Sequence, residues 1–295
     1  MNFQWFKDNL WQILINIIGG ACTAALAALY IQIRSKLQQR HFKHVFGSDI
    51  ESSEEFHLVY AELGLPNLYD QNRNIISHPY IKPIPVAGRR ENAFSIERPI
   101  SSCEVRAANY LAFVVGKEIR KSPNLTSDNS LIDKLNLSFI AFGGPSSNHK
   151  TNDLLINEAN KLISFHNYNF VSIHSNRPVI MRENEFDYGL ILKINPHQFP
   201  NRVWIACAGL GEWGSSGAAW YLANRWKYIY RYAKNKPFAI IVKVRPKQDE
   251  SAMPVFMVKT QKEMEDKISK NINLSDSEGL SSSRAIPGSG DYRPD

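Results

Sequence analysis

The sequence lacks charged side chains altogether between Asn9 and Ile33, a stretch that reads NLWQILINIIGGACTAALAALYIQI. A helix rises about 1.5 Å per residue, so this stretch is long enough to cross a hydrocarbon core about 30 Å thick. Trp11 and Tyr30 lie near its two ends, where amphipathic rings suit the headgroup level. A cleaved signal peptide is the competing interpretation, but the apolar run is too long and only Lys7 gives its flank positive charge. We therefore expect one transmembrane helix over residues 9–33.

The charge is unequal on the two sides of this stretch. Lys7 precedes it and is offset by Asp8. A basic cluster follows it, made up of Arg34, Lys36, Arg40, His41, Lys43 and His44. Positive flanks stay on the cytoplasmic side, which predicts a single-pass protein of the inner (cell) membrane with residues 1–8 external and the rest cytoplasmic. Residues 34–55 are then a basic juxtamembrane linker, which continues the helix over about 34–50 and can also hold anionic headgroups of the lipid bilayer.

Small residues recur along one face of the expected span. Asn16, Gly20, Ala24 and Ala28 are spaced four residues apart. Small side chains let two helix backbones approach closely, and an amide in lipid seeks a partner across such a contact. The alternative is an ordinary span that is rich in alanine. If the stripe is a contact face, the protein is a homo-oligomer.

Cysteines are few. Cys22, Cys103 and Cys207 fit neither a disulfide framework nor a zinc site, so we expect reduced cytosol and no metal. The formal net charge of +7 points to phosphate-bearing partners or a membrane surface, and nucleic acid is not among the expected partners. No internal repeat is present.

After the linker, the composition is that of one globular domain. With 43% hydrophobic and 21% charged residues in the chain, residues 56–265 can bury a sizeable core. The irregular connection over 64–99 contains Arg89 and Arg90, and so long a connection is usually functional. Residues 270–295 are rich in Ser, Gly, Asp and Pro and are expected to be a disordered tail.

Apolar runs and helical periodicity alternate through this domain. We expect strands over 56–63, 137–142, 188–194, 203–208 and 238–244, two short strands within 168–182, and helices over 103–120, 151–164 and 216–233. Strands that alternate with helices predict an α/β fold, with a Rossmann-like, mostly parallel sheet and flanking helices behind the transmembrane helix.

Two glycine-rich turns join expected strands to expected helices. The first comprises Gly143, Gly144, Ser146, Ser147 and Asn148, followed by Lys150. The second comprises Gly209, Gly211, Glu212, Trp213, Gly214 and Ser215. A doubly wound sheet binds ligands at such turns, where free N–H groups and the positive end of a helix favour an anion. The alternative is a tight connection in which Ser and Asn only cap the helix. The occurrence of two such turns favours a phosphate-bearing ligand.

Known motifs fit these turns incompletely. The first resembles a P-loop, but His149 stands where the second glycine belongs, which argues against ATP hydrolysis. The second satisfies G-x-G-x-x-G, but the following strand ends in Lys243 and Arg245 instead of an acid for a ribose hydroxyl, which argues against a dehydrogenase. Ser215 does not complete a G-x-S-x-G nucleophile elbow.

Two side chains of the second turn carry possible chemistry. Glu212 could receive a ribose hydroxyl, act as nucleophile or base on an N-glycosidic bond, or be a solvated loop acid. Trp213 could stack on a base.

The runs LSFIAFGGPSSN, DYGLILKINP and VWIACAGLGEWGSSGAAWYL resemble the LOG/DprA-related (STALD-like) nucleotide-sensing domains of bacterial antiphage effectors. The resemblance covers roughly residues 56–246, and the attached transmembrane helix is similar to the membrane effectors of cyclic-oligonucleotide defence systems. It implies that a nucleotide second messenger, such as a cyclic oligonucleotide, binds the cytoplasmic domain. No other cofactor is implied. The spans would then oligomerise and disrupt the inner membrane.

The resemblance also implies roles for the turns, with Gly143, Gly144 and Ser146 to Asn148 in one ligand loop, and Gly209, Gly211, Glu212, Gly214 and Ser215 in the other. LOG-type enzymes carry G-G-x-G-T-x-x-E, and no Glu follows the second turn at that spacing, so binding without turnover is favoured. The alternative is a membrane-anchored enzyme that cleaves a nucleotide or NAD with Glu212. A third possibility is a structural membrane protein that binds another protein.

Overall fold

The computed structural model describes residues 3–52, 54–62, 68–69, 75–76 and 100–270, except for the side chains of 3–8 and 13. The expected tail beyond residue 270 lies outside these residues. So does the connection with Arg89 and Arg90, apart from two short strands. These strands, β2 (Leu68–Tyr69) and β3 (Ile75–Ile76), pair antiparallel.

A seven-stranded sheet forms the centre of the domain, in the order β11-β10-β8-β9-β5-β1-β4. Its strands are β1 (Phe56–Tyr60), β4 (Asn124–Ser127), β5 (Ser138–Phe142), β8 (Asp187–Ile194), β9 (Trp204–Gly209), β10 (Phe238–Arg245) and β11 (Gln248–Val258). Neighbours among β4, β1, β5 and β9 pair parallel, whereas β8 pairs antiparallel with β9 and β10, and β11 pairs antiparallel with β10. The α/β class is confirmed, with a mixed sheet that is parallel in one half; the Rossmann-like identity stays a prediction.

Two layers cover the sheet. On one face lie the end of α1 (Phe3–Phe46), α2 (Ser102–Ile119) and α4 (Glu212–Ala233). On the other lie α3 (His149–Ile156), the hairpin of β6 (Ile163–His166) and β7 (Asn169–Ser172), and the helical residues 261–270. Alternate residues of β5 pack against the two layers. Both faces of the strand are therefore buried, which is why its sequence is a continuous apolar run. Short 3-10 helices, η1 (Ser48–Glu51) and η2 (Asn129–Leu131), join the elements.

Several elements differ from the expectation. α3 ends at Ile156, where the expected helix ran to residue 164, because Asn160 turns the chain by donating to the carbonyl oxygens of Leu155 (3.0 Å) and Ile163 (2.9 Å). α4 begins at Glu212, four positions earlier than expected. β4, β6 and β11 were not predicted; of the two short strands expected within 168–182 only β7 lies there, and its partner β6 precedes it. β8 reaches β9 without an intervening helix, which an antiparallel pair permits and a parallel pair does not.

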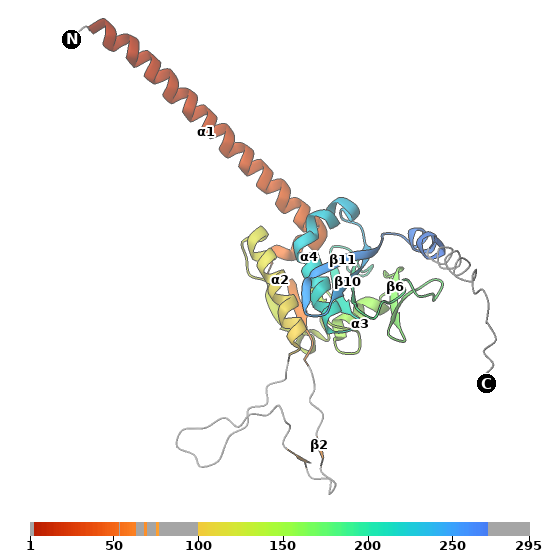
Figure 1. Ribbon diagram of the computed structural model, residues 1–295. Helices are drawn as coiled ribbons and strands as arrows, with labels where there is room; N and C mark the ends of the chain where they lie inside the picture. Colours follow the sequence, from red (N-terminus) through yellow and green to blue (C-terminus); the bar gives the residue numbers. More distant parts are fainter. Residues whose placement is uncertain (1–2, 53, 63–67, 70–74, 77–99, 271–295) are drawn as a thin grey trace, which may run out of the picture.

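α1 projects from the domain as one long helix (Figure 1). Its apolar window has a mean hydropathy of 1.9 and none of it is buried, so the helix is long and apolar enough to cross a membrane. Asn16, Gly20, Ala24 and Ala28 are all exposed along it. The helix continues without a break to Phe46, as expected for the start of the linker, but its last turns are packed against the domain. Phe42, Val45 and Phe46 are fully buried in the domain.

Candidate functional site

The two glycine-rich turns lie side by side at the carboxyl end of the parallel strands. β5 and β9 pair in register from Phe139–Trp204 to Phe142–Cys207, and Gly143 N–H then donates to the Cys207 carbonyl at 3.2 Å. A Cβ on Gly144 would lie 3.9 Å from the Gly209 carbonyl oxygen. The structure therefore brings the two predicted ligand loops together.

Asn148 organises the first turn. Its buried side chain accepts from the N–H groups of Lys150 (2.9 Å) and Thr151 (3.2 Å), and its amide nitrogen donates to the carbonyls of Phe142 (2.8 Å) and Val59 (3.2 Å). Asp128 accepts from the His149 N–H at 2.9 Å. The first amides of α3 are thus already bonded, and one of them is bonded to a carboxylate.

The second turn is closed in a similar way. Asp187, the first residue of β8, accepts from the Gly214 N–H at 2.7 Å. The Ser215 hydroxyl accepts from the Gly209 N–H at 2.8 Å, and the Leu210 N–H donates to the Tyr188 carbonyl at 2.9 Å. The start of α4 therefore also carries a carboxylate of the protein.

The glycines of the second turn allow the start of α4 to lie directly on the sheet. A Cβ on Gly209 or on Gly214 would collide with the backbone, in the latter case with the Tyr188 carbonyl oxygen. Gly143 is different, because its φ of 89° lies in the left-handed region that favours glycine. Close packing and turn geometry thus account for these glycines without a ligand.

An anion at either helix start would meet Asp128 or Asp187, whose negative charge repels it. The predicted residues are unequally accessible. Exposed are Ser146, Gly211 and Glu212; half-buried are Gly144, Ser147, Gly209 and Trp213; buried are Gly143, Asn148, Lys150, Gly214 and Ser215. A ligand would reach the rim of the turns, made up of Ser146, Ser147, Gly211, Glu212 and Trp213, before it reached their amides.

Lys150 was predicted as a ligand contact and lies elsewhere. Its side chain is fully buried, and its ammonium group donates to Asp153 (2.9 Å) and to the Ile132 carbonyl (3.3 Å). This placement gives Lys150 a structural role.

Trp213 remains at the rim but is already stacked on a cation. The Arg106 guanidinium lies 4.1 Å from the centroid of its ring. Asp249 and Ser216 hold that guanidinium, at 3.0 Å from Nε and 3.2 Å from Nη2. A base could stack only on the other face of the indole.

Glu104, in the first turn of α2, is the residue that the sequence analysis missed. It is 3% exposed, and its Oε2 accepts from the Ala61 N–H at 2.7 Å. Burial, with a smaller contribution from the charge of Asp128, raises the pKa of this carboxyl to about 7. A pKa near neutrality in a cleft is typical of functional carboxyls. The sequence does contain a pattern that could have indicated this residue: Glu104 lies four residues before Ala108 and therefore on the apolar face of the predicted helix.

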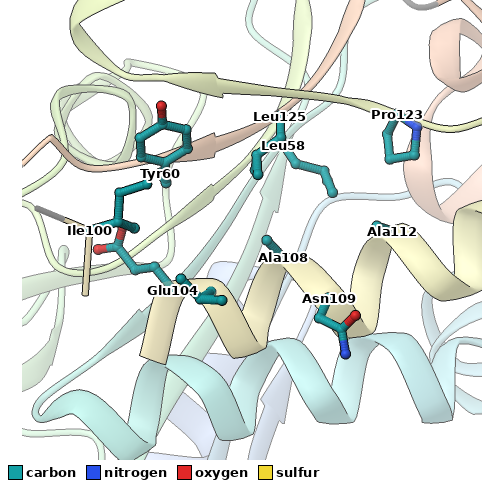
Figure 2. A pocket seen from close by; sticks show the side chains of 10 residues that line it. Leu58, Tyr60, Ile100, Glu104, Ala108, Asn109, Ala112, Pro123 and Leu125 are labelled. Atoms are coloured by element: carbon teal, nitrogen blue, oxygen red, sulfur yellow. The ribbon is translucent and has the colours of Figure 1, made fainter. Parts of the chain in front are cut away.

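Glu104 lies at a cavity of about 240 Å³ between α2 and the strands β1 and β4 (Figure 2). Apolar side chains form most of its wall, among them Leu58, Leu125, Ala108 and Ala112. An apolar pocket with few polar groups is the usual form of a small-molecule site. The domain therefore presents two features, the rim of the turns after β5 and β9 and this cavity along α2.

Among the described residues, no group of three His, Cys, Asp or Glu side chains could hold a metal ion. No protein-family model, curated protein or solved structure matches the chain. The resemblance to LOG/DprA-related domains therefore stays a prediction.

Proposed function

We propose that this protein is a membrane-anchored receptor and effector, in which a nucleotide second messenger binds the α/β domain and α1 carries the response to the bilayer. The single observation that supports this proposal best is the continuity of α1. One helix has an exposed apolar half and an end that is buried in the domain. A domain held in this way cannot turn without turning the span.

The contacts at the end of α1 come from two helices and the sheet. The Phe42 and Trp226 rings meet edge to face, 5.0 Å apart, and His41 stacks on Tyr230 at 4.1 Å. The buried ammonium of Lys193, on β8, donates to the His44 carbonyl at 2.5 Å. This bond satisfies a carbonyl in the last turns of α1, and burial lowers the pKa of Lys193 to about 7.

Both α2 and α4 connect the candidate site to α1. α2 carries Glu104 in its first turn, and near its other end Glu118 accepts from the side-chain amide of Gln38, on α1, at 2.7 Å. α4 begins at Glu212 and reaches Phe42 through Trp226. A ligand that favours one arrangement of these helices would therefore favour one orientation of the span.

The response in this proposal is self-association. The cytoplasmic domains of several copies would bind ligand, and the spans would meet through the exposed stripe of Asn16, Gly20, Ala24 and Ala28. Each site contributes only its preference for the assembled state, so a sharp response needs several subunits. Disruption of the inner membrane in antiphage defence is the outcome that the resemblance implies.

The test uses the full chain in detergent with cyclic di- and trinucleotides. Thermal shift reports binding and particle mass reports assembly. For the wild type we expect a higher Tm and a larger particle with at least one ligand. A variant with Ser35→Gly and Lys36→Gly softens α1 between span and domain; we expect it to keep the thermal shift and lose the mass change. Unchanged Tm and mass with every ligand would contradict the proposal.

The catalytic alternative rests on the exposure of Glu212 at the rim. Asp187 is a second carboxylate nearby, since a Cβ on Gly211 would lie 2.6 Å from its Oδ2. Two carboxyls at one rim are compatible with cleavage of an N-glycosidic bond. Incubation with NAD and nucleoside monophosphates tests this: the enzyme would release the free base, and Glu212→Gln would abolish release while ligand binding is retained.

A further inference from the structure

A groove of about 480 Å³ runs between α2 and α4, and residues of these two helices line it. Two of its lining residues contact α1. Glu118, on α2, accepts from the side-chain amide of Gln38 at 2.7 Å, and the Trp226 ring, on α4, meets the Phe42 ring at 5.0 Å. One end of the α2–α4 groove therefore lies beside α1, where this helix leaves the domain (Figure 1).

This end of the groove is close to the level at which α1 would leave a bilayer. Gln38 follows Ile33, the last residue of the charge-free stretch, by five positions, which is about 7.5 Å along a helix. The polar headgroups add about 5–7 Å to each side of the hydrocarbon core. A long basic side chain near the contact with Gln38 can therefore extend its charged end into the headgroup layer.

Basic side chains gather at this end of the groove. Lys117 of α2 and Lys227 of α4 line it and are exposed. Arg231, which is also exposed, lies one turn after Lys227 on the same face of α4. Glu118 lines the groove too, but it is 7% exposed and already accepts from Gln38. The charge that a ligand meets at this end is therefore positive.

We propose that this end of the α2–α4 groove binds the phosphate of an anionic lipid headgroup, with Lys117 and Lys227 supplying positive charge from two helices. Basic residues at the membrane surface attract anionic lipids, and a basic hollow between helices gives the headgroup a defined site. The bilayer is the source of phosphate that α1 brings to this place. The inference rests on the membrane anchoring in the proposed function and not on its nucleotide.

Such a site would give the domain a preferred orientation on the membrane. α1 alone fixes the domain at one point, whereas a lipid held by α2 and α4 adds a second point of attachment. The first turns of these two helices carry Glu104 and Glu212, so the same helices would contact the bilayer at one end and the candidate site at the other.

The test compares two pairs of lysine substitutions that change the net charge equally. Lys117→Gln with Lys227→Gln removes two charges from the groove. Lys161→Gln with Lys262→Gln, the control, removes two exposed charges from segments that cover the other face of the sheet. Native mass spectrometry of the full chain in uncharged detergent measures the affinity for phosphatidylglycerol, with phosphatidylcholine as the lipid without net charge.

We expect the wild type and the control to prefer phosphatidylglycerol, and the groove variant to bind this lipid roughly tenfold more weakly. Lys117→Arg with Lys227→Arg keeps both charges and is expected to retain the affinity of the wild type. Equal affinities of the groove variant and the control would overturn the inference, and so would the absence of any preference for phosphatidylglycerol in the wild type.

Glycerol 3-phosphate separates a lipid site from a site for a free phosphate compound. It carries the phosphate of the headgroup without acyl chains to hold it at the membrane surface. We expect it to leave phosphatidylglycerol bound when the two are present at equal concentration. Displacement of the lipid under this condition would assign the groove to a soluble ligand and overturn the inference.

Lipid and nucleotide titrations distinguish this inference from the proposed function. If cyclic oligonucleotides raise the Tm and enlarge the particle while phosphatidylglycerol binds the groove variant and the control equally, the receptor stands and the lipid site falls. If phosphatidylglycerol binding depends on Lys117 and Lys227 while no cyclic oligonucleotide binds, the lipid site stands and the receptor falls.

Discussion

The two ends of α1 differ in their surroundings, although they belong to one helix. Over its charge-free stretch, residues 9–33, apolar side chains such as Leu26 (67% exposed) and Ile31 (65%) contact little of the protein. In its last turns, Phe42 and Phe46 are fully covered by the domain. The apolar stretch is long and apolar enough to cross a membrane, whereas the last turns are part of the domain core.

The largest expected effect comes from the buried end. Phe42→Ala and Phe46→Ala each remove an aromatic ring from the core, and we expect each to lower the unfolding free energy of the domain by about 3–5 kcal/mol. Leu26→Ala, in the exposed half, is the matched control and should leave that free energy unchanged. Urea denaturation of the detergent-solubilised protein measures all three. Equal effects of Phe42→Ala and Leu26→Ala would remove the distinction between the two ends.

An effect of intermediate size is expected from pH, because the unfolding free energy of the domain depends on pH through Glu104. The charge-free stretch of α1 contains no group that gives such a dependence. The pKa of Glu104 is raised from 4.5 to about 7 in the fold, so the folded state binds more protons than the unfolded state between these values. Protonation of Glu104 therefore contributes about 3 kcal/mol to the unfolding free energy below pH 4.5. This contribution is lost as the pH rises through 7. Unfolding free energies of wild type and Glu104→Gln across this range measure it. A difference between them that does not change with pH would contradict the account.

The smallest expected effect lies in the exposed half. Gly20→Leu fills the stripe of small residues, and we expect it to weaken self-association of the span by about 1 kcal/mol, roughly fivefold. Ala21→Leu, at the next position on another face, is the control. Particle mass as a function of protein concentration in detergent measures the association. The domain Tm should be the same in both variants. Equal particle masses for Gly20→Leu and Ala21→Leu would show that the stripe is not a contact face.

Much of the fold follows from local patterns in the sequence. The charge-free stretch predicts the exposed half of α1, and the apolar runs predict β1, β5, β8, β9 and β10 because each run is buried in the sheet. The docking of α1 was missed because its basic neighbours suggested a linker. Phe42, Val45 and Phe46 are spaced by three and four positions, and this spacing indicates one buried helix face.

The candidate site was only partly predictable. The positions of the two turns follow from strand and helix order, which places them at one edge of the sheet. Their partners do not follow, because Asp128 comes from the segment after β4 and Asp187 from the start of β8, far from the turns in sequence. A carboxylate brought in by tertiary structure occupies amides at a helix start that would otherwise be free for an anion, so a phosphate-bearing ligand would be held at the exposed rim of the turns.

The most direct test of the coupling through α1 is amide hydrogen exchange of residues 37–46 in the full chain, held in a lipid disc. Continuity of the helix with the core predicts that these amides exchange as slowly as those of β5 and β9, because they open only when the domain unfolds. Rapid exchange over 37–46 beside a protected sheet would show a flexible linker and would contradict the account.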